Sequence, residues 1–198
     1  MTNARPRNAS RDEARPAIFL DRDGTVIEQV HYIGDPELVR LTPGAGPALR
    51  RLADAGFALV VVSNQAAIGK GVITQAQYDA VETRMAERLA EHGVRLTASY
   101  HCPKPGCGSD RMVIEQHDRK PGPGMLLQAA AEHRLDLARS WMVGDKLDDM
   151  RFARNAGLRG VLVETGHGAD EITRFAGARW FDVRPSLVEA ASLILEEA

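Results

Sequence analysis

The sequence predicts an α/β protein built on a doubly wound parallel sheet, and two patterns lead to this expectation. Short apolar runs bounded by turn residues occur at residues 17–20, 58–62, 141–143 and 160–163. Such runs are typical of strands buried on both faces of a parallel sheet. Amphipathic stretches lie between them, so strands and helices alternate along the chain.

The helical stretches follow the apolar runs in order. Residues 48–55 turn Leu49 and Leu52 inward, and residues 75–92 carry one apolar stripe made by Tyr78, Val81, Met85 and Leu89. Thr74 and Gln77 have the spacing of a capping box at the start of that second helix. Further helices are expected at residues 124–133, 148–156 and 187–196.

The length and composition suit one globular domain. The chain has 198 residues, of which 44% are hydrophobic, enough for a single core but too few for a second full domain. We expect a flexible N-terminal arm at residues 1–16 and one domain at 17–198. Residues 100–123 are rich in Pro, Gly and charge without periodicity, which predicts an irregular loop. The stretch between Thr25 and Thr42 is too short for a large cap domain, so the site should be open.

The net charge and the hydropathy narrow the classes of molecule that the chain is expected to bind. A net charge of −2 gives no general reason to bind nucleic acid or an anionic membrane. The sequence contains no apolar run of membrane-spanning length, and its polar start lacks the apolar core of a secretory signal. We therefore expect a cytoplasmic monomer that binds a small molecule.

Two acids follow the first apolar run. Asp21 and Asp23 stand at the exit of a buried strand, where open α/β sheets bind ligands, and Gly24 then lets the chain turn. Such a pair of carboxylates attracts a cation such as magnesium, and can divide labour between nucleophile and general acid–base. A strand-ending Asp beside an exposed turn Asp is the ordinary alternative for an isolated pair.

Three later segments supply what phosphoryl transfer would need. Ser63 follows the second apolar run and offers a hydroxyl, and Lys120 offers a positive charge. Asp145 follows the third run, with Asp148 and Asp149 just behind, and can complete a metal site. Each has an ordinary alternative, respectively a helix cap, a solvated lysine and a turn residue, but the ordered set is far more specific.

These motifs together resemble the haloacid dehalogenase superfamily, whose fold is a Rossmannoid α/β sheet. Its pattern is DxDGT, a strand-terminal Ser, a later Lys and GDxxxD. More closely, the segments FLDRDGTV, VVVSNQAAIGKG, RKPGPGML and MVGDKLDDM are similar to the D-glycero-D-manno-heptose bisphosphate phosphatases and the related histidinol phosphatases. The resemblance covers residues 17–168.

The resemblance implies a magnesium-dependent phosphatase and a role for each matching residue. Asp21 would attack phosphorus, and Asp23 would protonate the leaving oxygen and later activate water. Ser63 and Lys120 would hold the phosphoryl group. Magnesium would be held by Asp21, the main-chain carbonyl of Asp23, and Asp145, with Asp149 outside the ligand set. The substrate would be contacted by Asn64, Arg119 and Lys146, while residues 28–34 and the 100–118 loop would set specificity.

In relatives of the heptose bisphosphate group, Cys and His residues of this loop bind a zinc ion. The pattern of these ligands is altered in the present sequence. Lys104, Gln116 and Asp118 stand at three expected ligand positions. A substitute set would have to come from His101, Cys102, Cys107 and His117, although adjacent residues such as His101 and Cys102 seldom chelate one ion. We favour two reduced cysteines over zinc.

The leading hypothesis is removal of the C7 phosphate from D-glycero-D-manno-heptose 1,7-bisphosphate, on the route to lipopolysaccharide. The nearest rival is a phosphatase for histidinol phosphate or another small phosphoester. A rival of another class is a catalytically idle binding module with the same fold, against which the complete set of acids, serine and lysine argues.

Overall fold

The computed structural model describes residues 14–106, 114–175, 177 and 179–198. At its centre lies a parallel sheet of six strands in the order β3-β2-β1-β4-β5-β6. The strands are β1 (Ala17–Leu20), β2 (Ala58–Asn64), β3 (Ala98–Cys102), β4 (Trp141–Gly144), β5 (Arg159–Val163) and β6 (Asp182–Arg184). The chain builds outward from β1 in one direction and then, from β4, in the other. This confirms the predicted parallel α/β sheet and places its topological switch point between β1 and β4.

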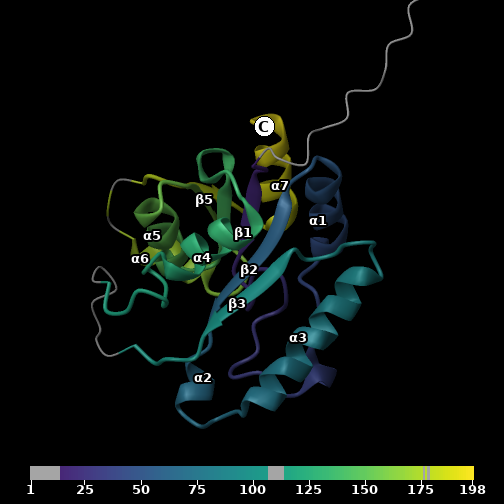
Figure 1. The fold of residues 1–198 in the computed structure, drawn as a ribbon, viewed down its shortest axis with the longest axis vertical. Coiled ribbons are helices and arrows are strands. Elements are labelled where there is room, and N and C mark those ends of the chain that lie inside the picture. Colours follow the sequence, from purple (N-terminus) through teal and green to yellow (C-terminus); the bar gives the residue numbers. More distant parts are fainter. Residues whose placement is uncertain (1–13, 107–113, 176, 178) are drawn as a thin grey trace, which may run out of the picture.

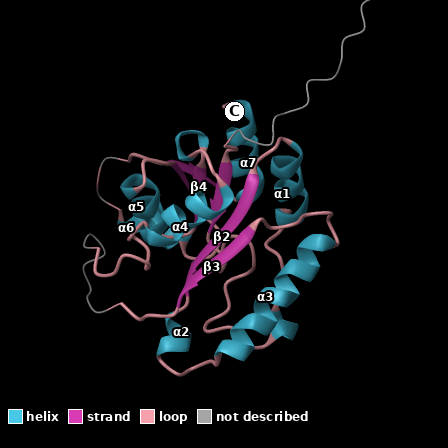
Figure 2. Cartoon of the chain, viewed as in Figure 1, coloured by secondary structure: helices cyan, strands magenta, loops and turns pink. Residues whose placement is uncertain are grey.

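Helices cover both faces of the sheet (Figures 1 and 2). One hydrophobic cluster joins the sheet to α1 (Ala45–Asp54), α3 (Gln75–Ala90) and α7 (Leu187–Glu196). The other joins it to α4 (Gly124–His133) and α5 (Leu147–Asn155), with α6 (Gly168–Arg174) at its margin.

The strand β1 shows why its apolar run is continuous. Ile18 and Leu20 pack in the first cluster, whereas Ala17 and Phe19 pack in the second. Successive side chains of a strand point to opposite faces, so a strand covered on both sides must be apolar at every position.

The predicted helices are present with small shifts of their ends. The helix α3 begins after Thr74, and the capping box of Thr74 and Gln77 is confirmed. The predicted stripe is also confirmed, since all four of its members are buried: Tyr78, Val81, Met85 and Leu89.

The strand β3 extends into the stretch predicted to be a loop, so the beginning of that loop at residue 100 was wrong. The sequence signal is weak because β3 is an edge strand whose side chains are mostly half-exposed. The short elements α2 (Ala66–Gly69), α6 and β6 were likewise not predicted. They are held by packing against larger elements and have too few residues for a periodic pattern.

Two residues assigned to the N-terminal arm bond to the domain. Arg15 forms a bridge with Leu135, and the carbonyl of Pro16 accepts a hydrogen bond from the Ala58 amide at 2.9 Å. Over the part of the chain that the structure describes, no helix is both long and apolar enough to cross a membrane.

Candidate active site

The predicted acids meet at the carboxyl edge of the sheet. Asp21 directly follows β1, Ser63 and Asn64 end β2, and Asp145 directly follows β4. The three strands are adjacent, with Leu20 in register with both Val61 and Val143. The Asp21 amide donates to the Val143 carbonyl at 2.9 Å, which fixes the turn into the site.

Lys120 binds the carboxylate of Asp21. Its Nζ donates to Asp21 Oδ1 at 2.7 Å and to the Val62 carbonyl at 2.8 Å, and it pairs with Asp149 Oδ1 at 2.6 Å. The Lys120 side chain is only 3% exposed, so its charge acts where water does not screen it. The lysine therefore orients Asp21 and adds positive charge beside it.

A cluster of three buried carboxylates surrounds this point. Oxygens of Asp21, Asp145 and Asp149 lie within 4.8 Å of one another. The Nζ of Lys146 is 3.1 Å from Asp145 Oδ1 and 3.6 Å from Asp21 Oδ2. The cluster thus contains three carboxylates and two ammonium groups.

The pKa values of the three acids diverge. Burial by itself would raise the pKa of Asp21, but Lys120 and Lys146 outweigh it and lower the pKa to about 2. Burial raises the pKa of Asp145 to about 7, and the neighbouring carboxylates add to this effect against the charge of Lys146. Burial also raises the pKa of Asp149 to about 6, although Lys120 opposes it. Asp21 is therefore ionised at neutral pH, as a nucleophile must be.

The donor set fits magnesium. Hard divalent cations take oxygen ligands, and Asp21 and Asp145 present carboxylate oxygens to one point in a buried site. Burial and the neighbouring carboxylates raise the pKa of Asp145, so a cation bound between these acids would favour its ionised form. Both carboxylate oxygens of Asp149 are already engaged, one with Lys120 and the other with the Lys146 amide at 3.0 Å.

Two glycines make room for Asp145. Gly24 has φ +89° and Gly166 has φ +59°, and a Cβ at either position would collide with Asp145 Oδ2. The same oxygen accepts a hydrogen bond from the His167 amide at 2.8 Å. Gly24 and Gly166 thus permit a close fit that no larger residue would allow.

The carboxylate of Asp23 is held by residues that the sequence reasoning did not assign. Arg22 binds it through two guanidinium nitrogens, and Gln65 Nε2 donates to its Oδ2 at 2.7 Å. Gln65 also donates to Ser63 Oγ at 2.8 Å. Its position directly after Ser63-Asn64 was the sequence signal that could have identified Gln65 as a site residue.

The three predicted substrate-binding residues lie in different settings. Asn64 exchanges two hydrogen bonds of 3.0 Å with the main chain of Lys120, which locks the lysine segment onto the end of β2. Arg119 donates to the Lys104 carbonyl at 2.9 Å and so connects to the irregular loop. Lys146 faces the carboxylates.

The substitute zinc set does not converge in the described part of the chain. His101 and Cys102 are neighbours on β3 and point to opposite faces. The ring of His101 packs on Tyr78 with centroids 4.2 Å apart, whereas Cys102 is buried in the cluster beneath α4. His117 is exposed, and Cys107 lies outside the described residues.

Two cavities that share lining residues lie at the site. A cavity of about 40 Å³ is lined by Asp21, Asp23, Ser63 and Lys120, among others. A second cavity of about 200 Å³ shares Asp23, Asn64 and Lys146 with it and is walled by residues 29–33. A small inner space beside a wider outer one suits a phosphoryl group attached to a small organic molecule.

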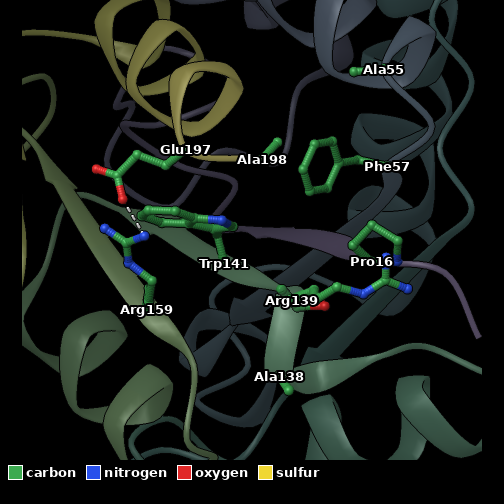
Figure 3. Close-up of a pocket in the computed structure, with 10 residues that line it drawn as sticks. Pro16, Ala55, Phe57, Ala138, Arg139, Trp141, Arg159, Glu197 and Ala198 are labelled. Carbon is green, nitrogen blue, oxygen red and sulfur yellow. Dashed lines mark ion pairs between the residues drawn. The ribbon is translucent and has the colours of Figure 1, made fainter.

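Another cavity, of about 360 Å³, lies at the opposite edge of the sheet (Figure 3). It is lined by residues at or just before the amino ends of the strands, including Pro16, Phe57, Trp141 and Arg159. Arg159 lies over the Trp141 ring at 3.8 Å and pairs with Glu197. Its lining contains none of the predicted catalytic residues, so size alone does not identify the site.

Comparisons with known proteins agree with the geometry. A family model described as HAD-hydrolase-like matches residues 117–190. The chain is similar to a D-glycero-D-manno-heptose-1,7-bisphosphate 7-phosphatase from Thermosynechococcus vestitus, with 43% identity over 78% of this chain and 81% of the relative. The D-glycero-beta-D-manno-heptose-1,7-bisphosphate 7-phosphatase from Escherichia coli K12 is 44% identical over 76% of this chain and 80% of the relative.

A solved structure shows the same likeness. The D,D-heptose 1,7-bisphosphate phosphatase from B. bronchiseptica, complexed with magnesium and phosphate, superposes with a TM-score of 0.81 at 32% identity. The match covers 92% of this chain and 99% of the solved one.

Proposed function

The chain belongs to the haloacid dehalogenase-like phosphatases, within the heptose bisphosphate phosphatases, and from this premise we propose that it removes the C7 phosphate of D-glycero-D-manno-heptose 1,7-bisphosphate. We also propose that it does so through a phosphoenzyme formed on Asp21. The observation that carries the mechanism is the buried pair of Asp21 and Lys120 at the switch point of the sheet.

The first step transfers the phosphoryl group to the protein. A carboxylate oxygen of Asp21 attacks phosphorus, and the bond from phosphorus to the C7 oxygen breaks. Asp23 donates its proton to that leaving oxygen, so the sugar departs as a neutral alcohol. Asp21 then carries the phosphoryl group as an acyl phosphate.

The second step returns the protein to its starting state. A water oxygen attacks the same phosphorus, and Asp23, now ionised, takes the proton of that water. The bond between phosphorus and Asp21 breaks, which releases inorganic phosphate and restores the carboxylate. Asp23 again carries the proton it needs for the next cycle.

The remaining residues stabilise the charge on the transferring group. Lys120 and the hydroxyl of Ser63 line the inner cavity and would face the phosphoryl oxygens. Magnesium, held by Asp21, Asp145 and the main-chain carbonyl of Asp23, would supply further positive charge to those oxygens. Asp149 also pairs with Lys120 and so helps to hold it beside Asp21.

The substrate assignment rests on the relatives and on the shape of the site. The relatives at 43–45% identity are named heptose-1,7-bisphosphate 7-phosphatases. The 200 Å³ outer cavity next to Asp23 offers space for the rest of a small phosphorylated molecule, and residues 29–33 of its wall lie where we expect specificity to be set. All six strands form one sheet, and the site lies at its carboxyl edge, which supports a single domain at 17–198.

A substrate panel tests the proposal. Initial rates would be measured with magnesium on both anomers of the heptose bisphosphate, histidinol phosphate and simple phosphomonoesters. We expect the highest kcat/KM for a heptose bisphosphate, and phosphorus NMR should show that the C1 phosphate is kept. Faster turnover of histidinol phosphate, with the Asp21→Asn protein inactive, would keep the chemistry and refute the substrate.

A further inference from the structure

Arg22 is a fully buried cation located between two carboxylates. Its side chain is 0% exposed, and it pairs with Asp23 at 2.8 Å and with Glu82 at 3.0 Å. Burial by itself would lower the pKa of Arg22, but the two acids outweigh it and hold the pKa above its usual value. The guanidinium is therefore permanently charged beside the site.

The contacts to Asp23 determine the orientation of its carboxylate. Arg22 Nη2 lies 2.8 Å from Oδ2 and 3.0 Å from Oδ1, and Arg22 Nε lies 3.1 Å from Oδ1. With Gln65 on Oδ2, both oxygens are held from the protein side. A forked pair of this kind fixes the plane of a carboxylate as well as its distance.

The other side of Arg22 is anchored far from the reacting atoms. Glu82 of α3 accepts from Arg22 Nη1, and its second oxygen accepts from Ser99 of β3 at 2.5 Å. The guanidinium also lies 5.1 Å from the centroid of the Tyr78 ring. Glu82 of α3 and Ser99 of β3 are thus linked to Asp23 through Arg22.

We propose that Arg22, held by Glu82, is a positioning residue that aims the carboxylate of Asp23 at the leaving oxygen. This inference rests on the proposed function, in which Asp23 is the general acid.

The test compares leaving groups. A sugar phosphate leaves as an alkoxide and needs a proton, whereas p-nitrophenyl phosphate leaves as a stable phenolate and does not. The constant to compare is kcat/KM, because it reports only the steps up to departure of the leaving group. General acid–base catalysis contributes about 10²–10⁴-fold, so partial loss of alignment in Glu82→Gln should lower kcat/KM for the sugar phosphate by about tenfold. For p-nitrophenyl phosphate it should fall by less than about threefold.

Two further variants make the result decisive. Ser99→Ala removes only one hydrogen bond to Glu82 at an exposed position, and should lower the sugar phosphate value selectively by about threefold, even if Glu82→Gln does not fold. Glu87→Gln, on the same helix but paired with Arg84 at an exposed position, is the control and should change neither value.

The outcomes separate the inference from the proposed function. Asp23→Asn should depress the sugar phosphate far more than the aryl phosphate. If Asp23→Asn does so while Glu82→Gln and Ser99→Ala lower both substrates equally or not at all, the positioning role is wrong. If Asp23→Asn itself shows no selectivity, the assignment of Asp23 as acid fails first.

Discussion

The Nζ of Lys120 lies 2.7 Å from Asp21 Oδ1, and both side chains are almost fully buried. Their segments are far apart in the sequence, and two hydrogen bonds of Asn64 hold the main chain of Lys120 against the end of β2. The expected effects of disturbing this arrangement follow from its burial and its charges.

Asp21→Asn should abolish turnover and leave the fold intact. An amide is a poor nucleophile and a poor metal ligand, while its size matches that of the carboxylate. Rates on a sugar phosphate should fall to the detection limit, with circular dichroism unchanged. Appreciable activity in protein free of contaminating phosphatase would contradict a covalent role for Asp21.

Lys120→Met should destabilise the protein as well as inactivate it. Removing the lysine leaves Asp21 and Asp149 buried without their shared partner, and breaking such a pair costs about 3–5 kcal/mol. Urea denaturation measures this loss. The double variant Lys120→Met and Asp149→Asn removes one uncompensated charge, so it should recover part of the stability and none of the activity. No difference in stability between the two variants would refute the charge argument.

Asp145→Asn should weaken magnesium binding and yet stabilise the metal-free protein. The raised pKa of Asp145, about 7, means that its ionised form is unfavourable in the folded state without metal. In chelator at pH 8 we expect a gain of about 1 kcal/mol, or about 2–4 °C in Tm for a chain of this size.

Added magnesium should reverse that order. It should raise the Tm of the wild-type protein more than that of Asp145→Asn, because the variant lacks one anionic oxygen ligand. The Glu87→Gln protein is the matched control and should respond to magnesium as the wild type does. An unchanged magnesium titration in Asp145→Asn would place the metal elsewhere.

The purified protein should be active with magnesium and without stoichiometric zinc. Structural zinc usually takes four Cys or His ligands, and His101 and Cys102 point to opposite faces of β3. Elemental analysis of protein purified without chelator tests this, together with a Cys102→Ser and Cys107→Ser double variant. About one zinc per chain, lost in the double variant, would show that the loop still binds zinc and that this prediction is wrong.

Much of the fold could be predicted because its signals are local. The buried strands β1, β2, β4 and β5 contain runs of successive apolar residues. The start of α3 is marked by the capping box of Thr74 and Gln77. The same holds for the chemistry at the ends of these strands. Asp21 and Asp145 directly follow buried strands, and parallel strands bring their carboxyl ends to one edge.

The edge strands β3 and β6 could not be predicted in this way. They are only partly buried, so hydrogen bonding to a neighbouring strand holds them and their own sequences contribute little. Asn64 shows the same limit at the site, because its bonds to Lys120 depend on a chain segment that the fold brings back from far along the sequence.

The sequence by itself determined the type of chemistry, since Asp21, Ser63 and Asp145 at or just after the ends of buried strands, together with Asp23 and Lys120, suit phosphoryl transfer. Only the tertiary structure decided how these groups are held. Glu82 lies on α3, and its side chain is mostly buried. No local pattern in the sequence distinguishes it from the exposed acids of that helix. Its partner Arg22 becomes a buried cation because α3 packs against the sheet beside it, which is a long-range contact that sequence periodicity does not encode.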